Sequence, residues 1–208
     1  MRSKQVAVAW RGGKVSARLY DGGGPPLLLA HGAGSDQRHP RMVGLAAALA
    51  REGLSVLTFN YPYTEAGRKR PDQQPVLLEV HRAARDHLSD MAGGEVVLAG
   101  RSMGGRMGTY LAAAGEPARA LVLYAYPLHP AGQPDKLRFD HLPEITQPML
   151  FIQGTRDALS RMDLFDRYIR PLPRATVRVL EGATHALDRR PEQTEALASL
   201  TVGWLAGI

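Results

Sequence analysis

The sequence predicts an α/β fold, with helices on both faces of a mostly parallel sheet of about eight strands. Short, continuously apolar runs alternate with stretches in which apolar residues recur at helical spacing. Such runs are typical of strands buried on both faces of a parallel sheet. The start of the chain differs, because two alternating segments flank the turn Arg11–Lys14 and predict an antiparallel hairpin. We expect a single domain over residues 1–208.

Each expected element follows from a local pattern. Turn residues bound the predicted strands, which are Gln5–Trp10, Val15–Tyr20, Pro26–Ala30, Leu54–Asn60, Val96–Ala99, Ala120–Ala125, Pro148–Gln153 and Thr176–Leu180. Apolar residues three or four positions apart predict helices over Met42–Ala50, Leu77–Met91, Met107–Ala114 and Leu164–Ile169, and a last helix that begins near Pro191. Helices connect the later strands, so these strands should be parallel.

Composition favours a globular domain and gives little indication of nucleic-acid binding. The chain has 208 residues, 44% of them hydrophobic, and a formal charge of +6. The basic residues are mostly arginine and lie scattered along the chain, with Arg68–Arg70 as a short cluster. No aromatic platform accompanies them, so we expect no nucleic-acid partner. The oligomeric state is left open.

The sequence shows no feature of a secreted or membrane-bound protein. Cysteine is absent, which excludes disulfides, thiolate metal sites and a cysteine nucleophile. After the charged start, the apolar segment Val6–Trp10 is too short for a signal-peptide core. No apolar run approaches the roughly 18 residues of a membrane span. We therefore expect a cytoplasmic protein with no membrane partner.

One short motif carries most of the functional information. Gly100-Arg-Ser-Met-Gly104 follows the apolar run Glu95–Ala99 and leads into a helix, so Ser102 lies at a strand-to-helix corner. The glycines are needed because the serine backbone is strained, and because the strand and helix leave no room for neighbouring side chains. Such a corner exposes the serine hydroxyl and is typical of a nucleophile elbow.

Two further residues complete a candidate catalytic triad. Ligands bind beyond the carboxyl ends of parallel strands, so loops that follow strands should carry the chemistry. Asp157 follows one predicted strand and His185 follows the last one, which gives the chain order Ser, Asp, His of an elbow hydrolase. We expect His185 to take the proton of Ser102 and return it to the leaving group. Asp157 should fix the imidazole tautomer and stabilise its cation.

Backbone N–H groups should stabilise the negative charge that develops on the substrate oxygen. One is the N–H of Met103, at the start of the helix that follows the serine. The other should come from the early glycine loop, where Ala33 is the first choice and Gly34 the second. We expect these two N–H groups to form the oxyanion hole.

Each member of the triad also has a structural interpretation. Ser102 could be a helix N-cap, and His185 a hydrogen-bonded loop histidine. Asp157 could be a turn residue, with Asp163 or Asp188 in its catalytic place. The joint occurrence of the three residues in this order favours the catalytic interpretation.

Other polar residues and glycine loops have simpler interpretations. We expect His31 and His129 to make structural hydrogen bonds, and Arg101 to bind an internal carboxylate rather than a substrate. The seven histidines form no His-Glu-x-x-His motif or close ligand pair, so no metal is expected. Gln37 stands where a dinucleotide loop would need its third glycine, and no Gly-Lys-Ser/Thr follows a glycine loop. We expect no cofactor.

With these motifs the chain resembles the α/β-hydrolase superfamily over nearly its whole length, and within it the branch related to dienelactone hydrolases. His31–Gly34, Gly100–Arg106 and Tyr126–Pro130 are similar to segments of a hydrolase-like group that includes a chromatin-complex subunit. The resemblance implies the α/β-hydrolase fold, with the triad and oxyanion hole named above. Dienelactone hydrolases carry a cysteine nucleophile, which this chain lacks, so their substrate is not transferred.

We expect a serine hydrolase that cleaves a carboxylic ester or related acyl bond of a small molecule through an acyl-serine intermediate. The alternative is a binding or scaffold protein with the same fold, and peroxide-dependent action by the same triad is a third interpretation. The stretch 127–147 contains Pro127, Pro130, Pro134 and Pro143, which disfavour a large helical lid and predict an open, shallow site.

Apolar and basic side chains near this site are expected to select the substrate. The bordering residues should be Tyr61, Tyr63, Leu128, Phe139 and Leu142, which favour small or medium acyl groups. A ring of basic residues at the mouth would indicate an anionic substrate and a rate that falls with added salt. The candidates for this ring are Arg38, Arg68, Lys69, Arg70, Lys136 and Arg138.

Overall fold

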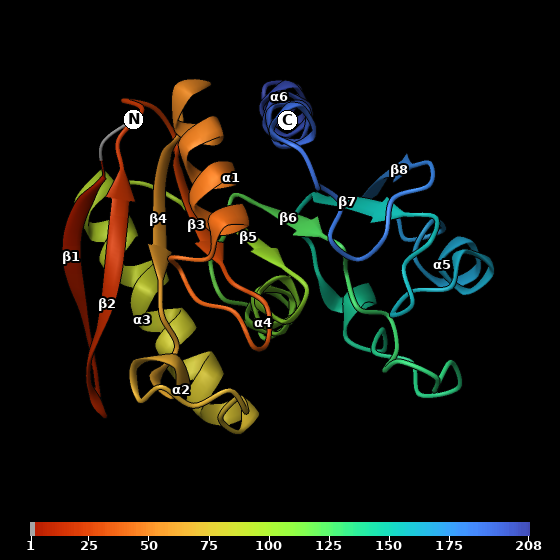
Figure 1. Cartoon of the computed structure of the whole chain (residues 1–208), viewed down its shortest axis with the longest axis horizontal. Coiled ribbons are helices and arrows are strands. Elements are labelled where there is room, and N and C mark those ends of the chain that lie inside the picture. Colours follow the sequence, from red (N-terminus) through yellow and green to blue (C-terminus); the bar gives the residue numbers. More distant parts are fainter. Residues whose placement is uncertain (1–2) are drawn as a thin grey trace.

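The computed structural model describes residues 3–208. Met1 and Arg2, which belong to the predicted domain 1–208 and its charged start, lie outside the described residues. Within them, eight strands form one sheet in the order β1-β2-β4-β3-β5-β6-β7-β8 (Figure 1). The strands are β1 (Lys4–Trp10), β2 (Gly13–Tyr20), β3 (Pro26–Ala30), β4 (Ser55–Phe59), β5 (Val97–Arg101), β6 (Ala120–Tyr124), β7 (Met149–Gly154) and β8 (Ala175–Leu180).

The sheet combines an antiparallel end with a parallel remainder, as the sequence predicts. β1 and β2 form the expected hairpin, and β2 also pairs antiparallel with β4. All pairs from β4 through β3, β5, β6 and β7 to β8 are parallel. The loops after these parallel strands therefore leave the sheet at one edge, where the predicted site residues lie.

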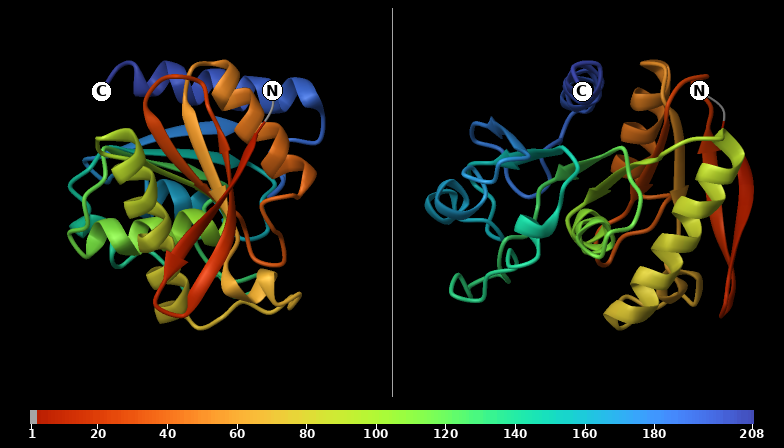
Figure 2. Two further views of the ribbon diagram at one scale, coloured as in Figure 1. Left: turned by 90° about the vertical axis from the view of Figure 1, so that its left-hand side faces the viewer. Right: turned by 180° about the vertical axis from the view of Figure 1, so that it is seen from behind.

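Helices cover both faces of the sheet. They are α1 (Pro40–Arg51), α2 (Pro62–Glu65), α3 (Gln74–Ala92), α4 (Met103–Ala113), α5 (Met162–Tyr168) and α6 (Pro191–Leu205), with the 3₁₀ turn η1 at Leu142–Glu144. Figures 1 and 2 show α1 and α6 together on one face, and α3 and α4 on the other. The sequence patterns predict all but α2 and η1, which are too short to show a periodicity. No helix within residues 3–208 has both the length and the apolar character that a membrane crossing requires.

The strand side chains divide the core into two parts. Along β3, Leu27 and Leu29 pack into the cluster under α1 and α6, whereas Leu28 and Ala30 pack under α3 and α4. This alternation follows from the two-residue period of a strand. Full burial of one leucine contributes roughly 2 kcal/mol, so the central strands hold the sheet edge rigid beneath the site.

Candidate active site

Ser102 lies at a sharp corner between β5 and α4. Its backbone has φ 50° and ψ −116°, a region that side-chain-bearing residues rarely adopt. The corner is held on both sides, because the Ser102 N–H donates to the carbonyl of Tyr124 at 2.9 Å and the Ser102 carbonyl accepts from the N–H of Arg106 at 3.1 Å. This is the strained strand-to-helix turn that the Gly100–Gly104 motif predicts.

The two glycines of the motif are required by space. A Cβ on Gly100 would lie 2.3 Å from the backbone nitrogen of Gly105, inside α4. A Cβ on Gly104 would lie 2.4 Å from the carbonyl oxygen of Ala30, at the end of β3. Both obstacles are backbone atoms that cannot rotate away, so only glycine fits at either position.

Asp157 and His185 are in direct contact. The Nδ1 atom of His185 lies 2.8 Å from Oδ2 of Asp157, whose side chain is fully buried. The same carboxylate also accepts hydrogen bonds from the Gln153 amide at 2.7 Å and from the Leu159 N–H at 2.8 Å. These three donors fix the carboxylate, and its bond to Nδ1 leaves Nε2 of the imidazole free to act as a base.

A close approach between two loops brings this pair together. A Cβ on Gly154, at the end of β7, would lie 2.3 Å from the carbonyl oxygen of Ala183. That carbonyl also accepts a hydrogen bond from the Arg156 N–H at 2.9 Å. Glycine at position 154 therefore lets the loop after β8 lie directly against the loop after β7, and His185 reaches Asp157.

Ser102 lies between two hollows. Together with His185 and Ala33 it lines the first, of about 340 Å³, which we call the histidine lobe. With Ala33 and Met103 it also lines the second, of about 380 Å³, which we call the helix lobe. In the described residues, neither the Ala33 N–H nor the Met103 N–H donates to another protein group. The structure thus brings the predicted triad and both predicted oxyanion donors to one place.

Arg101 binds an internal carboxylate, as predicted. Its guanidinium donates to both oxygens of Asp188, at 3.3 Å for Nη1, and to the carbonyl of Ala186. Asp188 is 2% exposed and also accepts from the Thr194 hydroxyl at 3.0 Å. This buried pair ties the nucleophile corner to the loop of His185. Asp188 therefore has a structural partner of its own, and Asp163 pairs with Arg161 at 2.6 Å, so neither replaces Asp157.

His31 and His129 make the structural hydrogen bonds that the sequence predicts. Nδ1 of His31 is 2.9 Å from the carbonyl of Gly32, and its Nε2 accepts from the Tyr61 N–H at 3.4 Å. Burial lowers the pKa of His31 to about 4, so the ring is neutral near pH 7. His129 joins the Pro130 carbonyl at 2.8 Å to the N–H of Arg161 at 3.0 Å. Both rings brace loops around the site.

The predicted substrate border is wrong. Tyr61 and Leu128 are fully buried, and Phe139 packs on Tyr168 with ring centroids 4.8 Å apart. Tyr63 and Leu142 are buried as well, and none of the five predicted border residues lines either lobe. These large apolar side chains complete the core beneath the loops, and the Tyr61 hydroxyl finds an internal partner in Nδ1 of His81 at 2.9 Å.

The walls of the helix lobe include one functional candidate that the sequence reasoning missed. Arg106, one helical turn after Ser102, lines this lobe together with Arg138, which belongs to the predicted basic set. A signal for Arg106 was present, since positions i and i+4 of a helix share a face. The predicted basic residues Arg38, Arg68 and Lys69 line a separate hollow of about 300 Å³ beside Gly34, and Arg70 and Lys136 line neither lobe.

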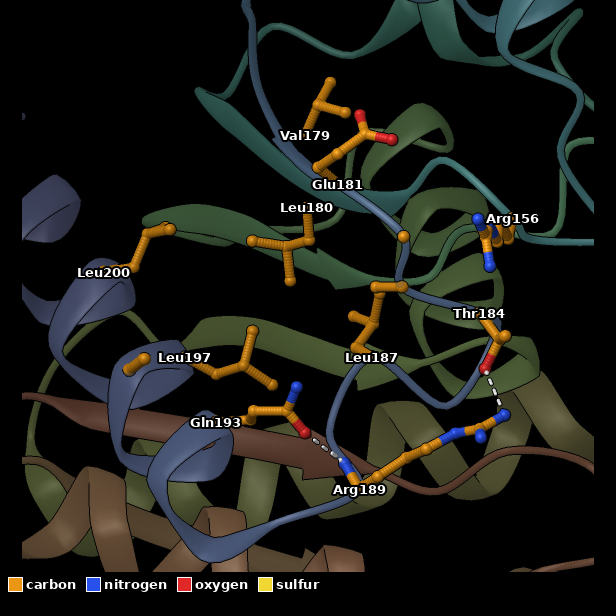
Figure 3. Close-up of a pocket in the computed structure, with 13 residues that line it drawn as sticks. Arg156, Val179, Leu180, Glu181, Thr184, Leu187, Arg189, Gln193, Leu197 and Leu200 are labelled. Atoms are coloured by element: carbon orange, nitrogen blue, oxygen red, sulfur yellow. Dashed lines mark hydrogen bonds between the residues drawn. The ribbon is translucent and has the colours of Figure 1, made fainter.

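A larger cavity, of about 580 Å³, lies between β8, the loop that follows it and α6 (Figure 3). It is lined by apolar side chains of β8, the loop and α6, among them Leu180, Leu187 and Leu197. A hydrogen bond from Arg189 to the Thr184 hydroxyl, at 3.4 Å, crosses one end. None of the predicted triad residues lines this cavity, so size alone does not locate the chemistry.

Comparison with known sequences decides the family. A family model described as the alpha/beta hydrolase domain matches residues 24–201. The chain belongs to the α/β-hydrolase family. Uncharacterized proteins of Mycobacterium tuberculosis strains CDC 1551 and H37Rv are 30% identical to this α/β hydrolase over 179 residues, which is 76% of the chain. The match spans 61% of the length of these curated relatives.

Several solved structures share the fold of this chain. An alpha-beta serine hydrolase homologue from Coxiella burnetii has a TM-score of 0.79 at 19% identity, covering 99% of this chain and 98% of its own. A dienelactone hydrolase from Anabaena variabilis has a TM-score of 0.79 at 24% identity, with 99% and 97% covered. Est1E from Butyrivibrio proteoclasticus has a TM-score of 0.75 at 17% identity, with 97% and 99% covered. The α/β-hydrolase fold predicted from the sequence is confirmed.

Proposed function

We propose that this α/β hydrolase is a serine hydrolase that cleaves a carboxylic ester or a related acyl bond through an acyl-serine intermediate. The observation that carries the proposal is the meeting of three features at one hollow. Ser102 occupies the strained corner, His185 lines the same histidine lobe, and Asp157 holds the imidazole at 2.8 Å. These are the nucleophile, base and orienting group that acyl transfer from an alcohol requires.

In the first half of the proposed reaction, Ser102 becomes acylated. As Oγ of Ser102 forms a bond to the substrate carbonyl carbon, its proton passes to Nε2 of His185. The tetrahedral intermediate then collapses, the bond to the leaving oxygen breaks, and the imidazolium returns the proton to the departing alcohol. Asp157 stabilises the imidazolium without taking its proton, because its own oxygens are already held by three donors.

Two backbone donors stabilise the tetrahedral intermediates in this proposal. The N–H of Met103 lies at the first position of α4, where a helix leaves its donors unsatisfied and carries partial positive charge. The N–H of Ala33 comes from the loop after β3, across the site from α4. A donor of this kind contributes about 3 kcal/mol to transition-state stabilisation.

In the second half, water releases the acyl group. Water replaces the alcohol, gives one proton to Nε2 of His185, and forms a bond to the acyl carbon. The bond to Oγ of Ser102 then breaks, and the proton returns to the serine. The products are one carboxylic acid and one alcohol, and the enzyme is regenerated.

A fluorophosphonate probe tests the nucleophile directly. We expect the probe to label the wild-type protein covalently, and Ser102→Ala to remove all labelling together with p-nitrophenyl acetate hydrolysis. Ser199→Ala is the matched control, since Ser199 is an exposed serine on α6 that donates to Glu52 at 2.7 Å. This control should label like the wild type. A wild-type protein that stays unlabelled under conditions that modify known serine hydrolases would instead be a binding or scaffold protein.

An ester panel tests the reaction class and the acyl size. The segment 127–147 contains η1 and no longer helix, so no helical lid covers Ser102 in the described chain. We expect p-nitrophenyl esters of two to six carbons to be cleaved with higher kcat/KM than those of twelve or more. This expectation follows from the volumes of the lobes, about 340 and 380 Å³, which lie near the lower end of the range of roughly 300 to 1,000 Å³ for small-molecule pockets. A preference for the long chains would contradict it.

A further inference from the structure

The helix lobe has an unusual charge distribution. Arg106 lies one helical turn after Ser102 on α4, and Arg138 comes from the segment between β6 and β7. Both arginines line the lobe next to Ser102 and Met103. Two guanidinium groups therefore face the space in which one end of a substrate bound at Ser102 would lie.

The two guanidinium groups have no protein partner within residues 3–208. There, Arg106 and Arg138 form no ion pair with a carboxylate, and their side chains donate no hydrogen bond. The Nε atom of Arg106 is buried without an acceptor. Burial and the nearby charge of Arg106 both lower the pKa of Arg138, which indicates that the two cations are close. Buried donors and paired like charges are unfavourable unless a ligand compensates them.

Asp72 also lines the helix lobe, and it pairs with Arg68 rather than with either of these arginines. Its Oδ1 accepts a hydrogen bond from Arg68 at 2.6 Å, and its Oδ2 is buried without a donor. Asp72 therefore does not neutralise Arg106 or Arg138, and no ion pair joins it to either of them. The lobe therefore holds two guanidinium groups that have no carboxylate partner within residues 3–208, and such groups suit a compact anion.

The position of His185 decides which end of an ester enters this lobe. His185 lines the histidine lobe and must return its proton to the leaving alcohol, so the alcohol departs on that side. The acyl chain then extends the other way, into the helix lobe. Leu77, Met107 and Pro127 line the same lobe and provide apolar walls for its methylene groups.

We propose that Arg106 and Arg138 bind a carboxylate at the far end of the acyl chain, so that the substrates are monoesters of short dicarboxylic acids. This proposal rests on the serine hydrolase function above. Attack by Oγ of Ser102 forms an acyl-enzyme whose second carboxylate is free, and it releases the alcohol with the proton carried by His185. Water then releases the free dicarboxylic acid and restores the serine proton. The distal carboxylate stays paired with the two guanidinium groups throughout.

A matched pair of esters tests the proposal. p-Nitrophenyl hydrogen adipate carries the distal carboxylate, and p-nitrophenyl 6-methylheptanoate has an isopropyl group of similar shape in its place. We expect the wild-type kcat/KM to favour the adipate half-ester by roughly tenfold or more, since charge-assisted pairs contribute at least that much discrimination. Arg106→Gln and Arg138→Gln should each lower kcat/KM for the half-ester about tenfold, and change it less than about threefold for the neutral ester.

A third variant controls for the loss of charge alone. Arg174 is exposed and directly precedes β8, at the opposite edge of the sheet from the site. Arg174→Gln should therefore leave kcat/KM for both esters unchanged. Equal wild-type rates on the two esters, or equal losses on both in the Arg106 and Arg138 variants, would overturn the carboxylate site and leave the serine hydrolase intact.

If no ester is hydrolysed, a binding measurement can still test the carboxylate site. In that case the proposed hydrolase function fails, and monomethyl adipate is titrated into the protein by calorimetry. Binding that is lost in Arg138→Gln and kept in Arg174→Gln supports the carboxylate site. Absence of any binding by the wild-type protein overturns it.

Discussion

The two arginines on either side of Ser102 have opposite surroundings. Arg101 precedes the serine and donates to the buried carboxylate of Asp188, whereas Arg106 follows it and has a buried Nε without an acceptor. On the side of His185, Arg101 is paired with Asp188 and the pair holds loops in place. On the side of α4, Arg106 and Arg138 form no ion pair within residues 3–208. Matched charges here build the site, and unmatched charges are free to recognise a ligand.

The largest predicted effect is a loss of activity in a variant of Asp157, which lies on the side of His185. Asp157→Asn keeps the shape of the side chain but removes the carboxylate that fixes the His185 tautomer. We expect kcat for p-nitrophenyl acetate to fall by about 10⁴-fold. Asp163→Asn is the matched control, because Asp163 is exposed and pairs with Arg161 on the surface. A loss of less than tenfold in Asp157→Asn would contradict the proposed triad.

The next effect concerns stability on the same side. Asp188→Ala leaves the guanidinium of Arg101, which is 11% exposed, without its carboxylate. Breaking such a pair should lower the free energy of unfolding by about 3 kcal/mol, measured by urea denaturation. In the double variant Arg101→Met/Asp188→Leu both charges are absent, and we expect part of the stability to return. A loss below about 1 kcal/mol in Asp188→Ala would show that the pair does not hold the His185 loop.

Two buried neutral histidines should make the stability of the protein depend on pH. Burial lowers the pKa of His31 to about 4 and that of His81 to about 3. The unfolded chain therefore binds protons below pH 6.5 that the folded chain does not, and stability is lost as the pH falls from 6.5 toward 4. Between pH 7 and pH 5 each histidine should remove on the order of 2 kcal/mol from the free energy of unfolding.

Urea midpoints at pH 7 and pH 5 measure this loss, since ordinary carboxylates titrate mostly below that interval. In His81→Gln the remaining fall in stability should be about half that of the wild type, because one of the two groups no longer titrates. If the pH dependence of stability is unchanged in this variant, His81 does not contribute to it.

The smallest effect is expected on the unmatched side. Arg106→Gln removes a charge that forms no ion pair in the described part of the chain and that lies close to Arg138. We expect the free energy of unfolding to change by less than about 0.5 kcal/mol, or to rise. Urea denaturation measures this change, and the loss of stability in Asp188→Ala is the value with which it is compared. A loss above about 1 kcal/mol would mean that Arg106 supports the fold, and the difference between the two sides would disappear.

Most of the fold could be predicted from the sequence because its strands are buried on both faces. β3 begins and ends at the predicted residues, and β4 lies within its predicted range. Continuous apolar runs between turn residues leave few alternatives for such segments. α2 was not predicted, since its four residues from Pro62 carry no helical period. The site residues at the ends of strands could be predicted for the same reason, because the topology fixes where those loops meet.

The walls of the site could not be predicted in this way. Tyr61 and Leu128 follow strands, as the triad residues do, yet their side chains turn inward and complete the core. Whether a loop side chain faces the core or the pocket depends on tertiary packing, which leaves no periodic signal in the sequence. The partner of Arg101 shows the same limit: a carboxylate was expected, but the choice of Asp188 depends on how the loop after β8 folds back.

The absence of room at Gly100 and Gly104 has an evolutionary consequence. Both positions are closed by backbone atoms of α4 and β3, whereas the serine between them meets the solvent-facing hollows with its side chain. Selection for folding therefore acts on the glycines. If the proposed function is correct, selection for turnover acts on the serine. Related chains that lack hydrolase activity should then keep both glycines while the residue between them varies.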